Sequence, residues 1–260
     1  MRTSSHRRWA KFLIPSRHRN AAAPAVISIV IPAYNEALLL GATIQALRDA
    51  ARALQEPVEI VVADDGSTDK TAAIAREHGA TVVQVALRNI GATRNAGARA
   101  AGGDLLVFVD ADTIVPAGVL TAAVAAVRDG RAIGGGAAAK PESDDPSWGP
   151  AAFRFASWLM RTFGFAAGCF LFVRRDVFER VGGFDERYFA SEEIHLSRAV
   201  KRHGRFIILR EAVVTSSRKG RLFGASAIAS QFARALVPGT LKRRDRLDHW
   251  YGGDREKDKK

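Results

Sequence analysis

The stretch "LLVFVDADTIV", Leu105 to Val115, places five apolar residues directly before two carboxylates that a single alanine separates. A continuous apolar run of this length is typical of a strand that is buried on both faces of a sheet. Asp110 and Asp112 then stand at the end of that strand, where their like charges repel each other. The stretch therefore predicts a covered sheet and, at its edge, a pair of carboxylates that needs a cation.

Upstream of this stretch, similar apolar runs alternate with helical patterns. The expected strands are Val26–Pro32, Val58–Ala63, 80–86 and 104–110. The expected helices run from about Glu36 to Leu54, from a cap near Ser67 or Thr68, and over 91–102. Such alternation is typical of an α/β fold with a mostly parallel sheet flanked by helices.

The second half of the chain loses the regular alternation. A Gly-rich strand is expected near 134–139, followed by an acidic, proline-containing loop to about Pro150 that we interpret as a mobile lid. A strand near 170, a short helix and the Gly182-Gly183 turn follow, and an amphipathic helix is expected to begin near Ser191.

Length and charge suggest one domain with basic ends. The chain has 260 residues, 47% of them apolar, and a net charge of +12. We expect a flexible basic arm over 1–23, the main folded domain over 24–215 and a basic helix and tail over 216–260. The single cysteine, Cys169, excludes an internal disulfide, and no apolar run approaches the roughly 18 to 20 residues that span a bilayer. We therefore expect a cytoplasmic protein with anionic partners.

Polar clusters follow three of the expected strands. They are "PAYNE" at 32–36, "DDGSTD" at 64–69 and "DAD" at 110–112. Because the carboxyl ends of parallel strands meet at one edge of a sheet, these clusters should converge there. That convergence indicates a functional site more strongly than any one cluster does.

Each cluster also has a purely structural interpretation. Asp110 and Asp112 can hold a hard divalent ion that shares substrate phosphates, or Asp112 can cap the next helix. Asp64 and Asp65 suit an Asx turn, and they can also accept a hydrogen bond from a nucleotide base. Both interpretations of this second pair can hold together.

Three further charged residues are candidates for chemistry. Arg94 lies in a helix of small residues and is either a phosphate or base contact or a solvated charge. Glu192 and Glu193 begin a helix, where acids are ordinary, but either could act as a general base. His195 on the same helix ranks below them.

Four stretches in this order resemble the motifs of family 2 glycosyltransferases with the GT-A (Rossmann-like) fold. They are "SIVIPAYNEA", "EIVVADDGSTDKT", "RNIGATRNAGARAAGGDLLVFVDADT" and "GGFDERYFASEEIHLSRAVKRHG". The resemblance covers about Val26 to Gly204. It implies transfer of a single sugar from a nucleotide-diphosphate sugar to an acceptor hydroxyl, with inversion and with Mg²⁺ or Mn²⁺.

The resemblance also assigns residues. It implies that Asp110 and Asp112 bind the metal and the diphosphate and that the acidic catalytic pair is Glu192 and Glu193, with Glu193 where an aspartate is usual. Which glutamate acts stays open. The residues expected to bind the nucleotide sugar are Pro32, Ala33, Tyr34, Glu36, Asp64, Asp65, Arg94, Asp110 and Ala111.

Two other function classes remain as alternatives. A nucleotidyltransferase would need a Gly-rich loop with a basic residue after the first strand, which "PAYNEALLLG" lacks. A nucleic-acid-binding protein would fit the net charge, but acidic clusters occupy the predicted functional edge, so we expect no nucleic acid partner. Family 2 enzymes commonly use lipid-linked acceptors. The basic ends, with Trp9 and Phe12 among arginines, could then hold the protein on the anionic inner face of the cell membrane.

Overall fold

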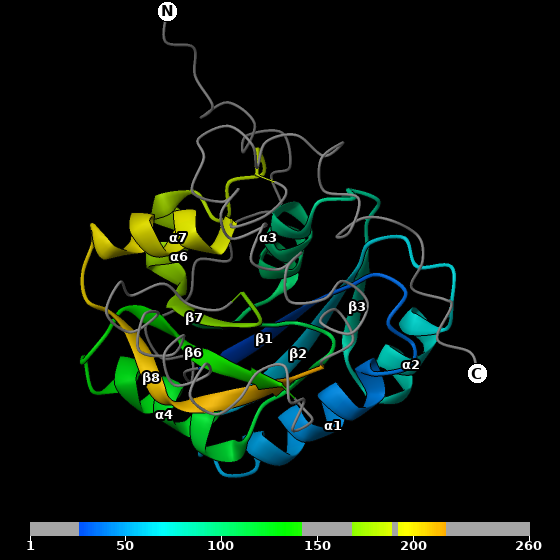
Figure 1. Cartoon of the computed structure of the whole chain (residues 1–260), viewed down its shortest axis with the longest axis horizontal. Coiled ribbons are helices and arrows are strands. Elements are labelled where there is room, and N and C mark those ends of the chain that lie inside the picture. The colour runs from blue at the N-terminus through cyan, green and yellow to red at the C-terminus, as the bar shows by residue number, and fades with distance from the viewer. Residues whose placement is uncertain (1–25, 142–167, 189–191, 217–260) are drawn as a thin grey trace, which may run out of the picture.

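The computed structural model of the chain describes residues 26–141, 168–188 and 192–216, which form one eight-stranded sheet with helices on both faces (Figure 1). The strands are β1 (Ile27–Ala33), β2 (Val58–Asp64), β3 (Thr81–Gln84), β4 (Leu105–Val109), β5 (Thr113–Ile114), β6 (Gly134–Pro141), β7 (Phe170–Arg174) and β8 (Phe206–Thr215). The helices are α1 (Leu40–Ala51), α2 (Thr71–Glu77), α3 (Ile90–Ala100), α4 (Ala117–Arg128), α6 (Arg175–Val181) and α7 (Glu192–Lys201).

The strand order across the sheet is β3-β2-β1-β4-β7-β6-β8-β5. The pairs β3-β2, β2-β1, β1-β4 and β6-β8 are parallel, whereas β7 is antiparallel to both β4 and β6, and β5 is antiparallel to β8. The predicted α/β sheet flanked by helices is thus confirmed, and its antiparallel pairings lie in the half where the sequence lost its alternation.

The sheet is buried on both faces. Alternate residues of β1 point to opposite sides, so Ile29 and Ile31 pack with α1 and α4 in one core, while Val30 packs under α3 in the other. Figure 1 shows α1, α2 and α4 on one face and α3, α6 and α7 on the other. This two-sided burial explains why the strands read as continuous apolar runs.

The strand register brings the polar clusters to one edge. Ala33 at the end of β1 pairs with Asp64 at the end of β2, and Val30 pairs with Phe108 near the end of β4. The chain leaves β1 toward β2 on one side and returns as β4 on the other, so the sheet order reverses at β1. In open α/β sheets, ligands bind outside the carboxyl ends of the strands at such a reversal.

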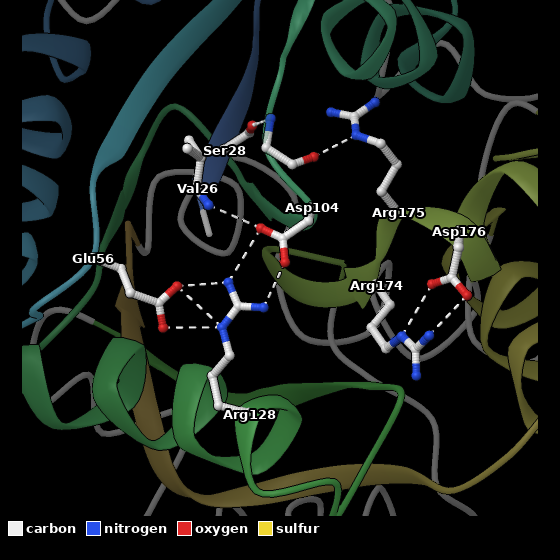
Figure 2. Close-up of polar contacts among 9 residues, drawn as sticks. Val26, Ser28, Glu56, Asp104, Arg128, Arg174, Arg175 and Asp176 are labelled. Carbon is white, nitrogen blue, oxygen red and sulfur yellow. Dashed lines mark hydrogen bonds and ion pairs between the residues drawn. The ribbon is translucent and has the colours of Figure 1, made fainter. Parts of the chain in front are cut away.

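At the opposite edge, ion pairs hold the amino ends of the strands (Figure 2). Arg128, the last residue of α4, contacts Glu56 and Asp104, each at 2.6 Å. Asp104 in turn accepts a hydrogen bond from the Val26 amide at 2.9 Å. These contacts tie α4 to the starts of β1 and β4, far from the polar clusters.

Two predicted helix starts were wrong. α2 does not begin at a cap formed by Ser67 or Thr68, since its first residue is Thr71 and no side chain caps it. Both hydroxyl residues instead bond to Asn35 in the loop after β1. α1 begins at Leu40 rather than near Glu36, whose carbonyl accepts from the Leu39 and Leu40 amides in a preceding turn.

Several predictions fall outside the described residues. The basic arm over 1–23, nearly all of the basic tail over 216–260 and the expected lid after Pro141 all lie there. The domain boundaries therefore stay predictions. In the three described ranges, none of the helices has both the length and the apolar character needed to cross a bilayer.

Candidate active site

The first two polar clusters form one interlocked loop pair. Asn35, in the left-handed region at φ +51°, donates its amide to Ser67 Oγ at 2.9 Å and accepts from the Thr68 amide at 2.8 Å. The amide of the buried Glu36 donates to Thr71 Oγ1 at 2.8 Å. Sequence reasoning placed these clusters at one edge, and the structure brings them into direct contact.

Asp64 and Asp65 shape the same edge in different ways. Asp64 Oδ1 accepts from the Ser67 amide, three residues on, at 3.1 Å, so its side chain closes the turn after β2 without leading directly into α2. Asp65 Oδ1 accepts from the amides of Leu87 and Arg88 at 2.6 and 3.0 Å, and its Oδ2 accepts from Thr93 Oγ1. Asp65 thereby fixes the loop between β3 and α3 against the end of β2.

That loop presents a cation to the aromatic residue of the first cluster. Arg88, at φ +48°, lies with its guanidinium carbon 3.8 Å from the centroid of the half-buried Tyr34 ring. Pro32 and Ala33, which precede Tyr34, are buried at the end of β1. A planar cation stacked on a ring beside Asp65 suits an aromatic base next to a phosphate.

The third cluster turns tightly at the end of β4. The Ala111 carbonyl accepts from Thr43 Oγ1 at 2.8 Å, and the Asp110 amide donates to the Cys169 carbonyl at 3.2 Å. The helix-cap interpretation of Asp112 is wrong, because α4 begins at Ala117 without a side-chain cap. Asp112 is 9% exposed, and within the described ranges no donor contacts its carboxylate.

Arg94 joins the third cluster to the acidic pair. Its guanidinium lies 2.8 Å from Asp110 Oδ1 and 2.6 Å from Glu192 Oε1, and it also donates to the Gly168 carbonyl at 2.9 Å. The side chain is 2% exposed, so the interpretation of Arg94 as a solvated charge is wrong, and its buried Nε has no partner among the described residues. Although burial alone would lower the pKa of Arg94, the nearby carboxylates raise it, so the cation is permanent.

The two glutamates at the start of α7 have different environments. Glu192 is buried in the ion pair with Arg94, and burial raises its pKa while Arg94 opposes the shift. Glu193 is half-buried, and its carboxyl packs beside Gly168, where an added Cβ would lie 3.5 Å from Glu193 Cδ. Burial and the neighbouring Glu192 charge raise the pKa of Glu193 to about 8. A carboxyl with that pKa can accept a proton near neutral pH.

His195 stacks on the Tyr188 ring, with ring centroids 3.8 Å apart. Sequence reasoning missed Asn89, Asn95 and Gly168 as parts of the site. Asn89 carried a helix-cap signal, directly before the small-residue helix, and it does cap α3 through the Ala92 amide at 2.8 Å. Nothing in the sequence indicated that the Asn89 and Asn95 side chains also bond to the segment 184–188 before α7.

The oxygen donors suit a hard divalent ion. Asp110 keeps one carboxylate oxygen clear of Arg94, and Asp112 is nearly buried with its charge uncompensated by described residues. Across the described ranges, no group of three or more His, Cys, Asp or Glu residues is placed to hold a metal. A cation at this pair would therefore need further oxygen ligands from water or from a bound phosphate.

Known proteins match this chain in the region that carries most of these residues. The family described as "Glycosyl transferase family 2" matches residues 28–182. The chain is 40% identical over 93 residues to an undecaprenyl-phosphate 4-deoxy-4-formamido-L-arabinose transferase of Serratia proteamaculans, covering 33% of this chain and 28% of that protein. It is 41% identical over 91 residues to a validoxylamine A glucosyltransferase of Streptomyces hygroscopicus, covering 33% and 21%. The chain thus spans about a quarter of the length of these relatives.

Solved structures share the fold at low sequence identity. The mannosyltransferase PcManGT of Pyrobaculum calidifontis, in complex with GDP-Man and Mn²⁺, has a TM-score of 0.61 at 20% identity and covers 90% of this chain and 72% of its own. Residues 1–349 of TarS from Staphylococcus aureus, in complex with UDP-GlcNAc, have a TM-score of 0.56 at 20% identity, covering 73% and 58%. At such identities the likeness establishes the fold.

Proposed function

The chain belongs to glycosyl transferase family 2 and has the GT-A fold, and from that premise we propose that it moves one sugar from a nucleotide-diphosphate sugar to an acceptor hydroxyl with inversion. One observation carries the proposal. Arg94 joins Asp110, at the end of β4, to Glu192 at the start of α7, so carboxylates suited to a diphosphate-bound cation stand beside a second, separate acidic pair.

The nucleotide end of the donor fits the interlocked loops. Tyr34 and Arg88 offer a stacked ring and guanidinium, and Asp65 holds the backbone of Arg88 beside the end of β2. PcManGT and TarS are complexed with GDP-Man and UDP-GlcNAc, so we propose a donor of that class for this chain. We propose that Pro32, Ala33, Glu36, Asp64 and Ala111, at the same edge of the sheet, also help to bind the nucleotide sugar.

Asp110 and Asp112 would hold Mg²⁺ or Mn²⁺ together with the donor's diphosphate. Such an ion neutralises charge that develops on the leaving diphosphate. Both carboxylates are hard oxygen donors, and neither Asp112 oxygen is committed to a described donor, so the residues fit the ion. Ala111 between them keeps the turn small, and Thr43 fixes its carbonyl.

Glu193 is the residue that we assign as general base. Glu192 is committed to Arg94, whereas Glu193 lies beside it with a pKa raised by burial to about 8. In the proposed step, the acceptor hydroxyl gives its proton to Glu193 as its oxygen bonds to the anomeric carbon. The bond from that carbon to the phosphate oxygen breaks on the opposite side, and the nucleoside diphosphate leaves with the electron pair.

The acceptor is proposed to be a glycan or a lipid-linked molecule in cell-surface synthesis. The Serratia relative is named an undecaprenyl-phosphate 4-deoxy-4-formamido-L-arabinose transferase, and we propose an acceptor of that lipid-linked class for this chain. With the basic ends, this supports a peripheral position on the inner face of the membrane. Sedimentation with anionic vesicles should show binding that falls as salt rises and is lost when residues 1–20 are deleted. Equal partitioning onto neutral vesicles, or none, would favour a soluble acceptor.

A donor panel tests the proposed reaction. The full chain is incubated with UDP-GlcNAc, GDP-mannose and related donors, in the presence of Mn²⁺, Mg²⁺ or EDTA. Hydrolysis of the donor, with water as the acceptor, is followed by the release of nucleoside diphosphate. Release from at least one donor, dependent on the divalent ion, is expected, and the Glu193→Gln variant should release nucleoside diphosphate more slowly by about two to four orders of magnitude. No release from any donor would contradict the proposal.

A further inference from the structure

The segment that leads to the acidic pair is held by α3. Asn89 Nδ2 donates to the carbonyls of Glu186 and Tyr188 at 3.0 and 3.1 Å. Its Oδ1 meanwhile caps α3 through the Ala92 amide. One buried side chain therefore both starts α3 and pins the chain four to six residues before α7.

Six residues further along α3, Asn95 binds the same segment. Its Oδ1 accepts from the Phe184 amide at 2.9 Å, and its Nδ2 donates to the Phe184 carbonyl at 2.9 Å and to Glu186 Oε1 at 3.1 Å. The contact is so close that a Cβ on Gly183, at φ +73°, would lie 2.6 Å from Asn95 Oδ1. The contact with α3 thus requires a glycine at position 183.

The gripped segment also packs onto the strand of the third cluster. The Phe184 ring meets the Phe108 ring edge-on, with centroids 4.9 Å apart. Phe108 precedes Asp110 by two residues on β4. Arg94, whose guanidinium carbon lies 5.3 Å from the Phe184 ring centroid, completes the arrangement by bonding Asp110 and Glu192 directly.

We call Asn89, Arg94 and Asn95 the α3 clamp. We propose that the α3 clamp positions Glu193 relative to Asp110 for the sugar transfer proposed above, on which this inference rests. Arg94 turns Glu192 inward at the start of α7. Successive helical residues point about 100° apart, so this contact turns Glu193 to the side where it packs against Gly168. The clamp members are positioning residues and do not touch the reacting atoms.

Asn89→Ser separates positioning from helix stability. Serine is as good a helix cap as asparagine, so α3 keeps its start, but the hydroxyl is too short to reach the carbonyls of Glu186 and Tyr188. Misplacement of a catalytic group by about 1 Å can cost about 100-fold in rate. We therefore expect kcat for donor hydrolysis to fall by about that factor, with donor affinity unchanged by calorimetry.

A matched control lies at the other end of the same helix. Arg175 donates to the carbonyls of Ala98 and Ala101, at 3.1 and 2.9 Å, and to that of Gly103. The Arg175 amide also donates to the Asp104 carbonyl at 2.8 Å, and Figure 2 shows both residues at the amino edge of the sheet. Arg175→Met removes side-chain donors from backbone carbonyls as Asn89→Ser does, and it should lower the melting temperature while kcat is retained.

Amide hydrogen exchange provides a readout that does not depend on activity. In Asn89→Ser, amides of 184–188 and 192–200 should exchange faster than in the wild type, while those of α3 stay protected. Unchanged exchange of these amides in Asn89→Ser would overturn the proposal. Faster exchange in Asn89→Ser with full kcat would also overturn it, as would a loss of kcat in Arg175→Met equal to that in Asn89→Ser. If the wild type turns over no donor, the proposed function fails, and exchange alone then decides whether the clamp holds α7.

Discussion

Replacing Glu193 by glutamine tests the assignment of the base and leaves the shape of the site intact. The amide keeps nearly the same volume beside Gly168 but cannot accept the proton of the attacking hydroxyl. A general base contributes about two to four orders of magnitude to the rate, so kcat should fall by about that amount. Donor affinity, measured by calorimetry with Mn²⁺, should not change, because Asp110 and Asp112 are untouched.

The raised pKa of Glu193 adds a pH signature. Burial and the Glu192 charge raise this pKa to about 8, so only about one-tenth of Glu193 is deprotonated at pH 7 in the free enzyme. A base must be deprotonated to act. The value of kcat/KM, which reports on the free enzyme, should therefore rise about tenfold per pH unit below pH 7 and level off above about pH 8.

Glu192→Gln is the control for this prediction. It removes the like charge that raises the pKa of Glu193 and frees Arg94 to interact with Glu193, and both effects lower that pKa. The rise of kcat/KM with pH should then occur at lower pH than in the wild type. A rise that stays at the same pH or moves to higher pH would refute the electrostatic reasoning. Loss of turnover in Glu192→Gln together with full turnover in Glu193→Gln would refute the assignment of the base.

Three other variants have defined outcomes. Asp112→Asn should remove Mn²⁺-dependent donor binding in calorimetry without lowering the melting temperature, since it relieves repulsion, and unchanged affinity would contradict the ion site. Gly183→Ala should cost about 2 kcal/mol in denaturant unfolding, because φ is +73° and the new Cβ meets Asn95 Oδ1, and an unchanged midpoint would contradict this. Partial burial alone would raise the pKa of Asp104, but hydrogen bonds from Arg128 lower it below its ordinary value. The Arg128–Asp104 pair therefore stabilises the fold at pH values above the ordinary pKa of aspartate, and this stabilisation is lost as the pH falls through the lowered pKa. Arg128→Ala should thus lower the melting temperature at pH 7 but hardly at pH 2.5. An equal drop in melting temperature at both pH values would contradict this stabilisation by the pair.

The strands of the first half could be predicted from sequence because burial on both faces leaves a direct trace. Residues such as Ile29, Val30 and Ile31 alternate between two cores, so successive positions in a strand are mostly apolar. The polar residue that follows each parallel strand then stands at the edge where the carboxyl ends of those strands meet. This logic correctly placed Tyr34, Asp65 and Asp110 together.

Long-range polar contacts could not be predicted. Ser67 looked like a helix cap, but its hydroxyl serves Asn35, which lies 32 residues earlier. Nor could the sequence choose between the two glutamates, because neighbouring residues of one helix differ only in direction. The choice depends on Arg94, which lies 98 residues from Glu192 along the chain and meets it only in the fold.

The most direct test of sugar transfer by single displacement is the anomeric form of the first product. Proton NMR should follow hydrolysis of whichever α-linked donor the wild type turns over, with Mn²⁺, before the released sugar mutarotates. The account predicts the β-anomer and nucleoside diphosphate in equal amounts at the earliest times, and neither in Glu193→Gln. An α-anomer as first product, or equal release by Glu193→Gln, would contradict it.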